Sequence, residues 1–267
     1  MLGGVSPVPG WPPPESWAIP LASPAPPPSP VLPSPAPDLP PPPGHHPAGS
    51  PLPSQAHGFD ASFPECGPAR QPRAGAFALL GVNGGRAFSL NPCFLGQWLT
   101  APSPRFIYLN SGYNPANAAK TTASCRALAK GRLPTAPLRT AYAIGCSTAV
   151  DTMRALAQVG AAPPLAWWID VESANSWDVR AALNRASLEG EVDALATTHL
   201  AVGVYATFRD WAAIVGSWDY GGISADWVAG QSPARACSSP GFSLAPVWIS
   251  QEPATWPGSG WDSDYAC

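Results

Sequence analysis

The sequence predicts an α/β protein whose strands close into a (β/α)₈ TIM-type barrel, regular or irregular, preceded by a proline-rich segment. Short apolar runs alternate with helical stretches after residue 55, and about seven or eight of these runs suit strands. A doubly wound open sheet is the runner-up fold. The chain lacks the GxGxxG and Walker motifs that usually accompany nucleotide cofactors in such sheets, and we expect no cofactor.

The strand-like runs are short and rich in β-branched or aromatic residues, and glycine, proline or asparagine follows several of them. In chain order they are residues 57–62, 77–83, 106–110, 165–172, 201–206, 225–229 and 246–250. Residues 139–145 suit either a strand or the lead into a helix. Alternating strand and helix units imply parallel strands with right-handed crossovers.

Two helices are predicted from apolar residues that recur at helical spacing. Residues 148–159 carry Val150, Met153, Leu156 and Ala157. Residues 178–198 form a longer helix with Ser176 as its N-cap. The core face of this helix is expected to consist of Val179, Leu183, Leu188, Val192 and Leu195.

Proline divides the chain into two parts. Residues 1–54 contain 21 of the 37 prolines, no Lys or Arg, and only Glu15 and Asp38 as charged residues. Such a segment favours extended, solvated polyproline II, and we interpret it as a disordered linker. A ligand for proline-binding domains is the less favoured interpretation. Residues 55–267 then form one barrel domain of a size that supports a full core.

Charge and hydropathy exclude several partners. Charged residues make up 12% of the chain, the net charge is −3, and no basic run occurs. Nucleic acid is therefore a poor partner. No apolar run approaches the length that spans a membrane. We expect a monomer. We also expect no bound metal, because the His and Cys residues are not spaced as metal ligands.

Six cysteines indicate an oxidising compartment, and so a secreted or wall-associated protein, although no signal peptide is visible in this chain. The alternative is six buried thiols. The preferred pairing is sequential, although the sequence leaves 15 pairings open: Cys66–Cys93, Cys125–Cys146 and Cys237–Cys267.

The strongest chemical signal is a pair of acids at the end of the apolar run Ala166–Val171. Asp170 and Glu172 are two residues apart, so their side chains leave one face of a strand, with attachment points roughly 6.6 Å apart. Carboxylate pairs on this scale cleave glycosidic bonds. The simpler alternative is that both acids only accept backbone hydrogen bonds at the strand end.

Other polar residues fall at or near strand ends, where barrel active sites lie. Asp60 lies on the first strand and is predicted to orient a sugar or to tune the pair. Asp264 is favoured slightly over Asp262 as a further site residue. The expected substrate contacts are Asn83, Asn110, Trp168, Tyr205, Gln251 and Asp262. Asp226 is discounted because it lies near the start of its strand.

Four short segments give a family resemblance over about residues 57–267. Gly58–Ser62 and Asp170–Glu172 resemble the opening strand and the Asp-x-Glu signature of glycoside hydrolase family 25 lysozymes. With Gly81–Gly85, Asp170–Trp177 and Asp262–Cys267, the pattern is most similar to extracellular, actinobacterial-type family-25-like proteins of unknown function.

The resemblance implies a muramidase-like enzyme that cleaves β-1,4 bonds of peptidoglycan or a related glycan. In that reading Glu172 is the neutral general acid, and Asp170 stays ionised to stabilise positive charge. The chain departs from the lysozymes at Asn83, where they usually carry an acid, and at Tyr108–Asn110. Two alternatives therefore remain: a carbohydrate-binding module without turnover, and a surface spacer.

Overall fold

The computed structural model describes residues 49–66, 75–255 and 261–267, and its strands form one closed barrel in the order β1 to β8. The predicted barrel is therefore confirmed and the open sheet is excluded. The strands are β1 (His57–Ala61), β2 (Ala78–Gly81), β3 (Arg105–Asn110), β4 (Trp167–Asp170), β5 (Val202–Thr207), β6 (Ala225–Ala229), β7 (Val247–Thr255) and β8 (Asp262–Ala266).

The irregularity of the barrel lies in its last strand. Neighbouring strands from β1 to β7 are parallel, whereas β8 is antiparallel to both β7 and β1. Strand β8 was not among the runs predicted from the sequence, which end at residue 250. Because β8 runs the other way, its first residue, Asp262, lies opposite Asp60 at the carboxyl ends of the parallel strands.

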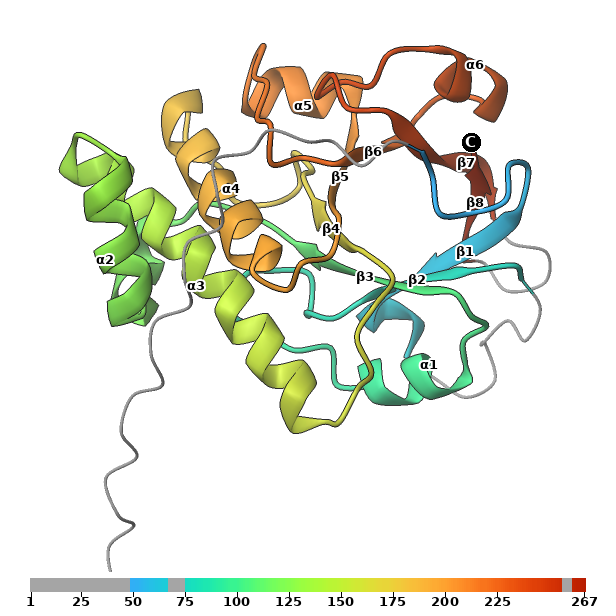
Figure 1. Ribbon diagram of the computed structural model, residues 1–267, viewed down its shortest axis with the longest axis horizontal. Coiled ribbons are helices and arrows are strands. Elements are labelled where there is room, and N and C mark those ends of the chain that lie inside the picture. Colours follow the sequence, from blue (N-terminus) through green and yellow to red (C-terminus); the bar gives the residue numbers. More distant parts are fainter. Residues whose placement is uncertain (1–48, 67–74, 256–260) are drawn as a thin grey trace, which may run out of the picture. The chain divides into compact units, whose positions relative to one another are not determined.

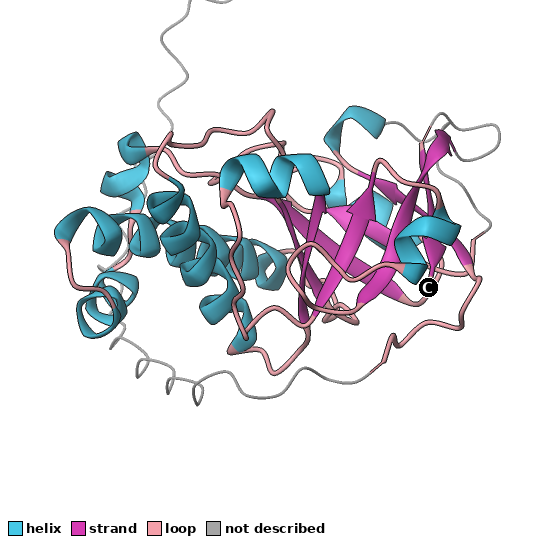
Figure 2. Ribbon diagram, turned by 90° about the horizontal axis from the view of Figure 1, so that it is seen from above, coloured by secondary structure: helices cyan, strands magenta, loops and turns pink. Residues whose placement is uncertain are grey.

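The helices differ in length and cover the barrel unevenly. The helices within residues 123–196 lie together on one side of the strands (Figures 1 and 2). The helices are α1 (Phe94–Thr100), α2 (Ala123–Arg132), α3 (Ala136–Gln158), α4 (Ala181–Ala196), α5 (Phe208–Ile214) and α6 (Pro233–Ser238), with short 3₁₀ turns η2 (Phe63–Glu65) and η4 (Pro115–Lys120).

Two helix predictions need correction. Residues 139–145 are helical, so α3 begins at Ala136 and not at 148. Helix α4 begins at Ala181 after Arg180, so Ser176 is not its N-cap. Val179 precedes the helix and is fully exposed, whereas the other four residues of the predicted core face are buried.

Close packing of α3 on α4 forms the most extensive helix–helix contact. A Cβ atom at Gly190 of α4 would lie 2.1 Å from the Tyr142 carbonyl oxygen of α3. A Cβ atom at Gly145 would lie 1.8 Å from the Ser187 carbonyl oxygen. The two backbones therefore touch, and only glycine fits at these two positions.

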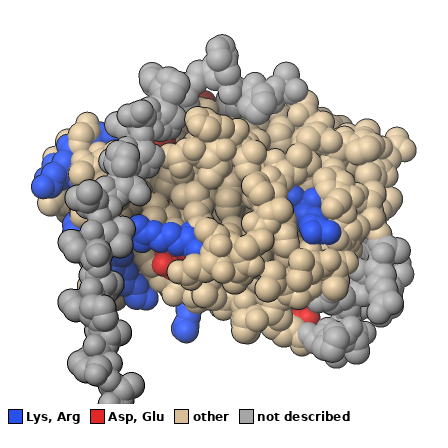
Figure 3. All heavy atoms as spheres, turned by 60° about the horizontal axis from the view of Figure 1, so that its bottom comes forward, with Lys and Arg blue, Asp and Glu red and all other residues tan. Residues whose placement is uncertain are grey.

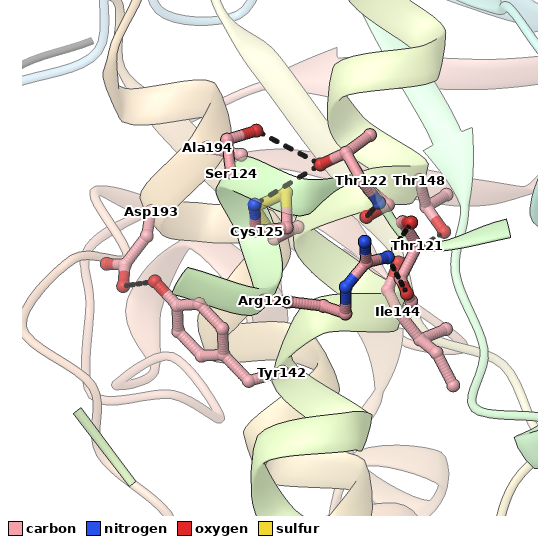
Figure 4. Close-up of a disulfide and its surroundings, with 12 residues drawn as sticks. Thr121, Thr122, Ser124, Cys125, Arg126, Tyr142, Ile144, Thr148, Asp193 and Ala194 are labelled. Atoms are coloured by element: carbon pink, nitrogen blue, oxygen red, sulfur yellow. Dashed lines mark hydrogen bonds between the residues drawn. A yellow bond between two sulfur atoms is a disulfide. The ribbon is translucent and has the colours of Figure 1, made fainter. Parts of the chain in front are cut away.

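Three disulfides have the predicted sequential pairing, Cys66–Cys93, Cys125–Cys146 and Cys237–Cys267. Cys125–Cys146 joins α2 to α3 (Figure 4). In the same region the Tyr142 hydroxyl donates to Asp193 of α4 over 2.6 Å, and Arg132 of α2 forms an ion pair with that carboxylate. These contacts fasten three helices into one layer.

Side chains that point into the barrel form two levels. The lower level is an aromatic core that includes Phe77, Phe106, Trp168 and Trp248, and Leu52 packs in the same cluster. The polar side chains of Asp60, Asn110 and Asp170 lie above it, at the carboxyl ends of the strands. Most of the predicted linker 1–54 lies outside the described residues.

Two further surface properties bear on partners. No helix among the described residues is both long and apolar enough to cross a membrane. On the face drawn in Figure 3, Lys and Arg side chains lie in small separate groups, and no continuous basic area forms.

Candidate active site

A cavity of about 230 Å³ opens at the carboxyl ends of the parallel strands, where active sites of such barrels lie. Five acidic side chains line it, and no Lys, Arg or His does so among the described residues. The lining residues are Asp60, Ser62, Pro64, Glu65, Tyr108, Asn110, Asp170, Glu172, Tyr205, Trp227, Gln251 and Asp262.

Asp170 and Glu172 both line this cavity, as their two-residue spacing predicts. Strand β4 places Trp168 and Asp170 inside the barrel, while Trp167 and Ile169 pack in the cluster beneath the helices. Asp170 ends the strand and is almost fully buried. Glu172 follows in a turn held by two bonds to its carbonyl, from Trp177 Nε1 at 2.7 Å and Asn175 N at 3.0 Å.

Burial raises the pKa of both acids in this pair. The pKa of Asp170 lies well above its usual range, because the side chain is buried and the charge of Glu172 is close. Burial and the charge of Asp210 raise the pKa of Glu172. Asn110 Nδ2 donates to Asp170 Oδ2, but Oδ1 has no hydrogen-bond partner within the described part of the chain.

The surroundings of the two acids bear on which of them holds a proton. Asp170 was expected to stay ionised beside a neutral Glu172. Asp170 is the more buried of the two and has the stronger tendency to hold a proton, so the pair binds its proton jointly. Glu172 is the partly exposed member, and so the one that a ligand reaches more readily.

Asp60 stands across the cavity at the β1–β8 seam. Gln251 Nε2 donates to Asp60 Oδ2 over 3.0 Å, and the Tyr205 hydroxyl donates to Gln251 Oε1 over 2.8 Å. Burial and the nearby charge of Asp262 raise the pKa of Asp60 to about 7. Asp60, Tyr205 and Gln251 therefore form one hydrogen-bonded chain along the cavity wall.

Asp262, and not Asp264, lines the cavity. Asp264 was slightly favoured from the sequence, but it lies opposite Gly58, below Asp60, and is fully buried. Trp227 Nε1 donates to its Oδ1 over 2.8 Å. Burial, and after it the charge of Asp60, hold the pKa of Asp264 well above its usual range, and a hydrogen bond joins the two carboxyls. Burial therefore favours the protonated form of Asp264, which is the donor in this hydrogen bond to Asp60.

Trp168 does not reach the cavity. Its side chain is fully buried, and its ring packs edge-on against Phe106, Trp227 and Trp248. It therefore belongs to the aromatic core beneath the acids, and the predicted substrate contact does not fit this position. Tyr205 does line the cavity, with its ring against Trp227 at 4.4 Å between centroids.

Asn83 supports the site from outside the cavity lining. Its Nδ2 donates to the Asn110 carbonyl over 2.9 Å, and its Oδ1 accepts from the Asn110 amide over 3.0 Å. The amide side chain thus continues the ladder where β2 has ended and fixes Asn110, the donor to Asp170. A substrate contact at Asn83 was expected from the sequence, but its side chain is 1% exposed.

Replacing Asn83 by alanine should remove both buried hydrogen bonds to Asn110. We expect Asn83→Ala to lower the free energy of unfolding by about 1–3 kcal/mol, because two backbone groups lose partners. Urea unfolding measures the change, with Asn117→Ala on a surface turn as the control. Equal stability of both variants would show that the two hydrogen bonds from Asn83 to Asn110 do not stabilise the protein.

Several lining residues were not predicted. Tyr108 lies two residues before Asn110, and Trp227 lies one residue after the discounted Asp226; period-two alternation would have placed both inside the barrel. Glu65 lies in the η2 turn, where its carboxylate accepts from the Ser62 amide over 2.9 Å, and the Ser-x-x-Glu pattern of a capping box could have indicated this turn. Asp226 itself is fully buried and accepts hydrogen bonds from Ser243, as a structural residue does.

Glu191 of α4 lies buried behind the end of β3. Ser111 Oγ donates to its Oε2 over 2.6 Å, and Oε1 has no hydrogen-bond partner in the described ranges. Burial raises the pKa of Glu191 to about 8. This carboxyl is therefore neutral at pH 7 and anchors the segment that follows Asn110.

Replacing the titratable carboxyl of Glu191 by an amide should change how the free energy of unfolding depends on pH. The folded protein holds this proton up to about pH 8, whereas an unfolded glutamate loses it near 4.5, so this group's stabilising contribution is lost as the pH rises between those values. We expect the free energy of unfolding of Glu191→Gln, relative to that of the parent, to rise by a few kcal/mol between pH 5 and pH 9. Urea unfolding at several pH values measures it. A constant difference between the two proteins would contradict the assignment.

Comparisons with known proteins identify the same fold. Residues 145–227, which include Asp170 and Glu172, match a family model described as Lysozyme-like protein 1. A search of curated protein sequences finds no match.

Solved structures with this fold include three lysozymes or muramidases. A muramidase from Trichobolus zukalii is similar with a TM-score of 0.54 and 14% identity, over 79% of this chain and 93% of that one. The bacterial lysozyme from Streptomyces coelicolor has a TM-score of 0.53 and 16% identity, over 80% and 92%. The GH25 lysozyme from Aspergillus fumigatus has a TM-score of 0.51 and 14% identity, over 80% and 94%. The fold that the family resemblance predicted is thus confirmed.

Proposed function

We propose that this chain is a lysozyme-like glycoside hydrolase that cleaves β-1,4 bonds of peptidoglycan or a related N-acetylated glycan. The observation that carries the proposal is the cavity with five acidic side chains, of which Asp60, Asp170, Glu172 and Asp262 have raised pKa values. Acetal cleavage needs an acid that still holds a proton near neutral pH, together with carboxylates that stabilise positive charge.

Glu172 is the proposed general acid. A glycan that enters the cavity removes water from the Glu172 carboxyl, which raises its pKa further and draws the proton of the pair toward it. Glu172 then gives the proton to the leaving glycosidic oxygen, and the bond from that oxygen to the anomeric carbon breaks. Asp170, having given up its proton to Glu172, supplies the negative charge of the pair to the developing oxocarbenium ion. Water then adds to the anomeric carbon and gives a proton to the Glu172 carboxylate, which restores the acid.

Asp60 and Asp262 complete the proposed site on the opposite wall. Buried Asp264 donates a hydrogen bond to Asp60 and so stabilises its ionised form. Tyr205 and Gln251 fix the orientation of Asp60. We propose that Asp60 and Asp262 accept hydrogen bonds from sugar hydroxyl or amide groups, while Asn110 holds Asp170. The three disulfides support a secreted or wall-associated location.

Incubation of the full chain with purified peptidoglycan tests the proposal. Release of new reducing ends and soluble fragments is the expected result. Binding to the insoluble glycan without release would overturn the hydrolase and favour a binding module. Neither binding nor release would contradict both functions and leave a spacer.

A further inference from the structure

A second cavity, of about 450 Å³, lies beside the acidic one and differs from it in charge. Residues close in sequence at the ends of two strands line the two cavities: Asn110 lines the first and Ser111 the second, and Glu172 lines the first and Ala174 the second. An extended ligand lying across the ends of β3 and β4 would therefore pass from one cavity to the other.

Two cations and several amides line this second cavity, and no acidic side chain of the described chain does so. Lys120 Nζ lies 5.1 Å from the centre of the Phe88 ring, so a cation–π contact holds it at the rim. Arg86 comes from the loop after β2. Within the described ranges, no carboxylate lies within 4.0 Å of either cation. The polar lining is completed by Ser111, Asn114, Asn117, Asn175 and Ser176.

Charge is therefore segregated along the ends of the strands. The first cavity is lined by carboxyl groups, which include those of Asp170 and Glu172. The second is lined by the cations Arg86 and Lys120. An anionic substituent on a glycan would be repelled from the first cavity and attracted to the second. Such a charge step fixes the direction in which the glycan lies, because only one direction places the anion beside the cations.

We infer that the second cavity binds a free carboxylate of the peptide that substitutes peptidoglycan, and that Arg86 and Lys120 are its ligands. This inference rests on the proposed function. The guanidinium of Arg86 presents paired donors to a carboxylate, and Lys120 supplies a point charge. The asparagine side chains of the cavity can donate to and accept from the amide groups of such a peptide.

Binding measured without turnover tests the inference. The Glu172→Gln protein is titrated calorimetrically with soluble glycan strands that carry their peptides and with the same strands after their free carboxylates have been converted to amides. We expect the strands with free carboxylates to bind about fivefold more tightly at low salt. Further substitution of Arg86→Gln and Lys120→Gln should abolish this preference, as should high salt.

A matched control removes the same charge elsewhere. Lys130 of α2 and Arg154 of α3 are exposed and do not line either cavity, so Lys130→Gln with Arg154→Gln should retain the preference. Equal binding of both strand types by the Glu172→Gln protein without further substitutions would overturn the inference. An equal loss of the binding preference in both double variants would also overturn it. A preference that depends on Arg86 and Lys120 in a protein that releases no reducing ends would support the inference and contradict the hydrolase.

Discussion

Glu172→Gln should lower the rate of reducing-end release from peptidoglycan by about 10³-fold, with little change in glycan binding. The amide has nearly the shape of the carboxyl but carries no proton that it can give to the leaving oxygen. The neighbouring Asp170 is almost fully buried and hydrogen-bonded to Asn110, so it does not replace the lost acid. Initial rates at saturating substrate measure the effect.

Glu189→Gln is the matched control for this prediction. Glu189 lies on α4 outside the cavity lining, so the same chemical change there should leave the rate within about twofold of the parent. Retention of more than a tenth of the parent rate by Glu172→Gln would mean that another group supplies the proton.

Gly190→Ala should destabilise the protein by about 3 kcal/mol. The new Cβ atom would lie 2.1 Å from the Tyr142 carbonyl oxygen, and a backbone atom cannot move aside as a side chain does. Helices α3 and α4 would have to separate, which also displaces Glu191 and its bond to Ser111. Chemical unfolding measures the loss.

Gly131→Ala in α2 provides the comparison, because no atom lies within 4 Å of the added Cβ there. Alanine is the better helix former, so this variant should be unchanged or more stable by up to about 1 kcal/mol. If both variants kept the parent stability, the close approach of α3 and α4 would not be a determinant of the fold.

Much of the barrel could be predicted because its parallel strands are buried on both faces and stand out as short apolar runs. Strand β8 could not, because Asp262 and Asp264 interrupt its apolar pattern. Both aspartates are tolerated only because the barrel supplies Trp227 and Asp60 as partners for Asp264 and solvent for Asp262. The start of α4 was also misplaced, since Ser176 and Val179 suit a helix start locally, while the chain is irregular from Ser176 to Arg180.

The acid pair could be predicted from its spacing, but the protonation of its members could not. Burial decides which carboxyl keeps the proton, and burial of Asp170 depends on strands that are distant in sequence. Trp168 was misassigned for a similar reason. An aromatic residue two positions before an acid shares its face of the strand, and in a closed barrel that position lies one level lower, inside the core.

Asp170 and Glu172 are proposed to hold a shared proton beside an open cavity near neutral pH. Carbon-detected NMR titration of carboxyl-labelled protein, with Glu172→Gln used to assign the signals, measures this proton directly. We predict that the pair takes it up well above the pKa of 4.5 of an exposed glutamate, and that an N-acetylated oligosaccharide raises the uptake further. Titration of both carboxyls as exposed acids, unchanged by the sugar, would contradict the proposed mechanism.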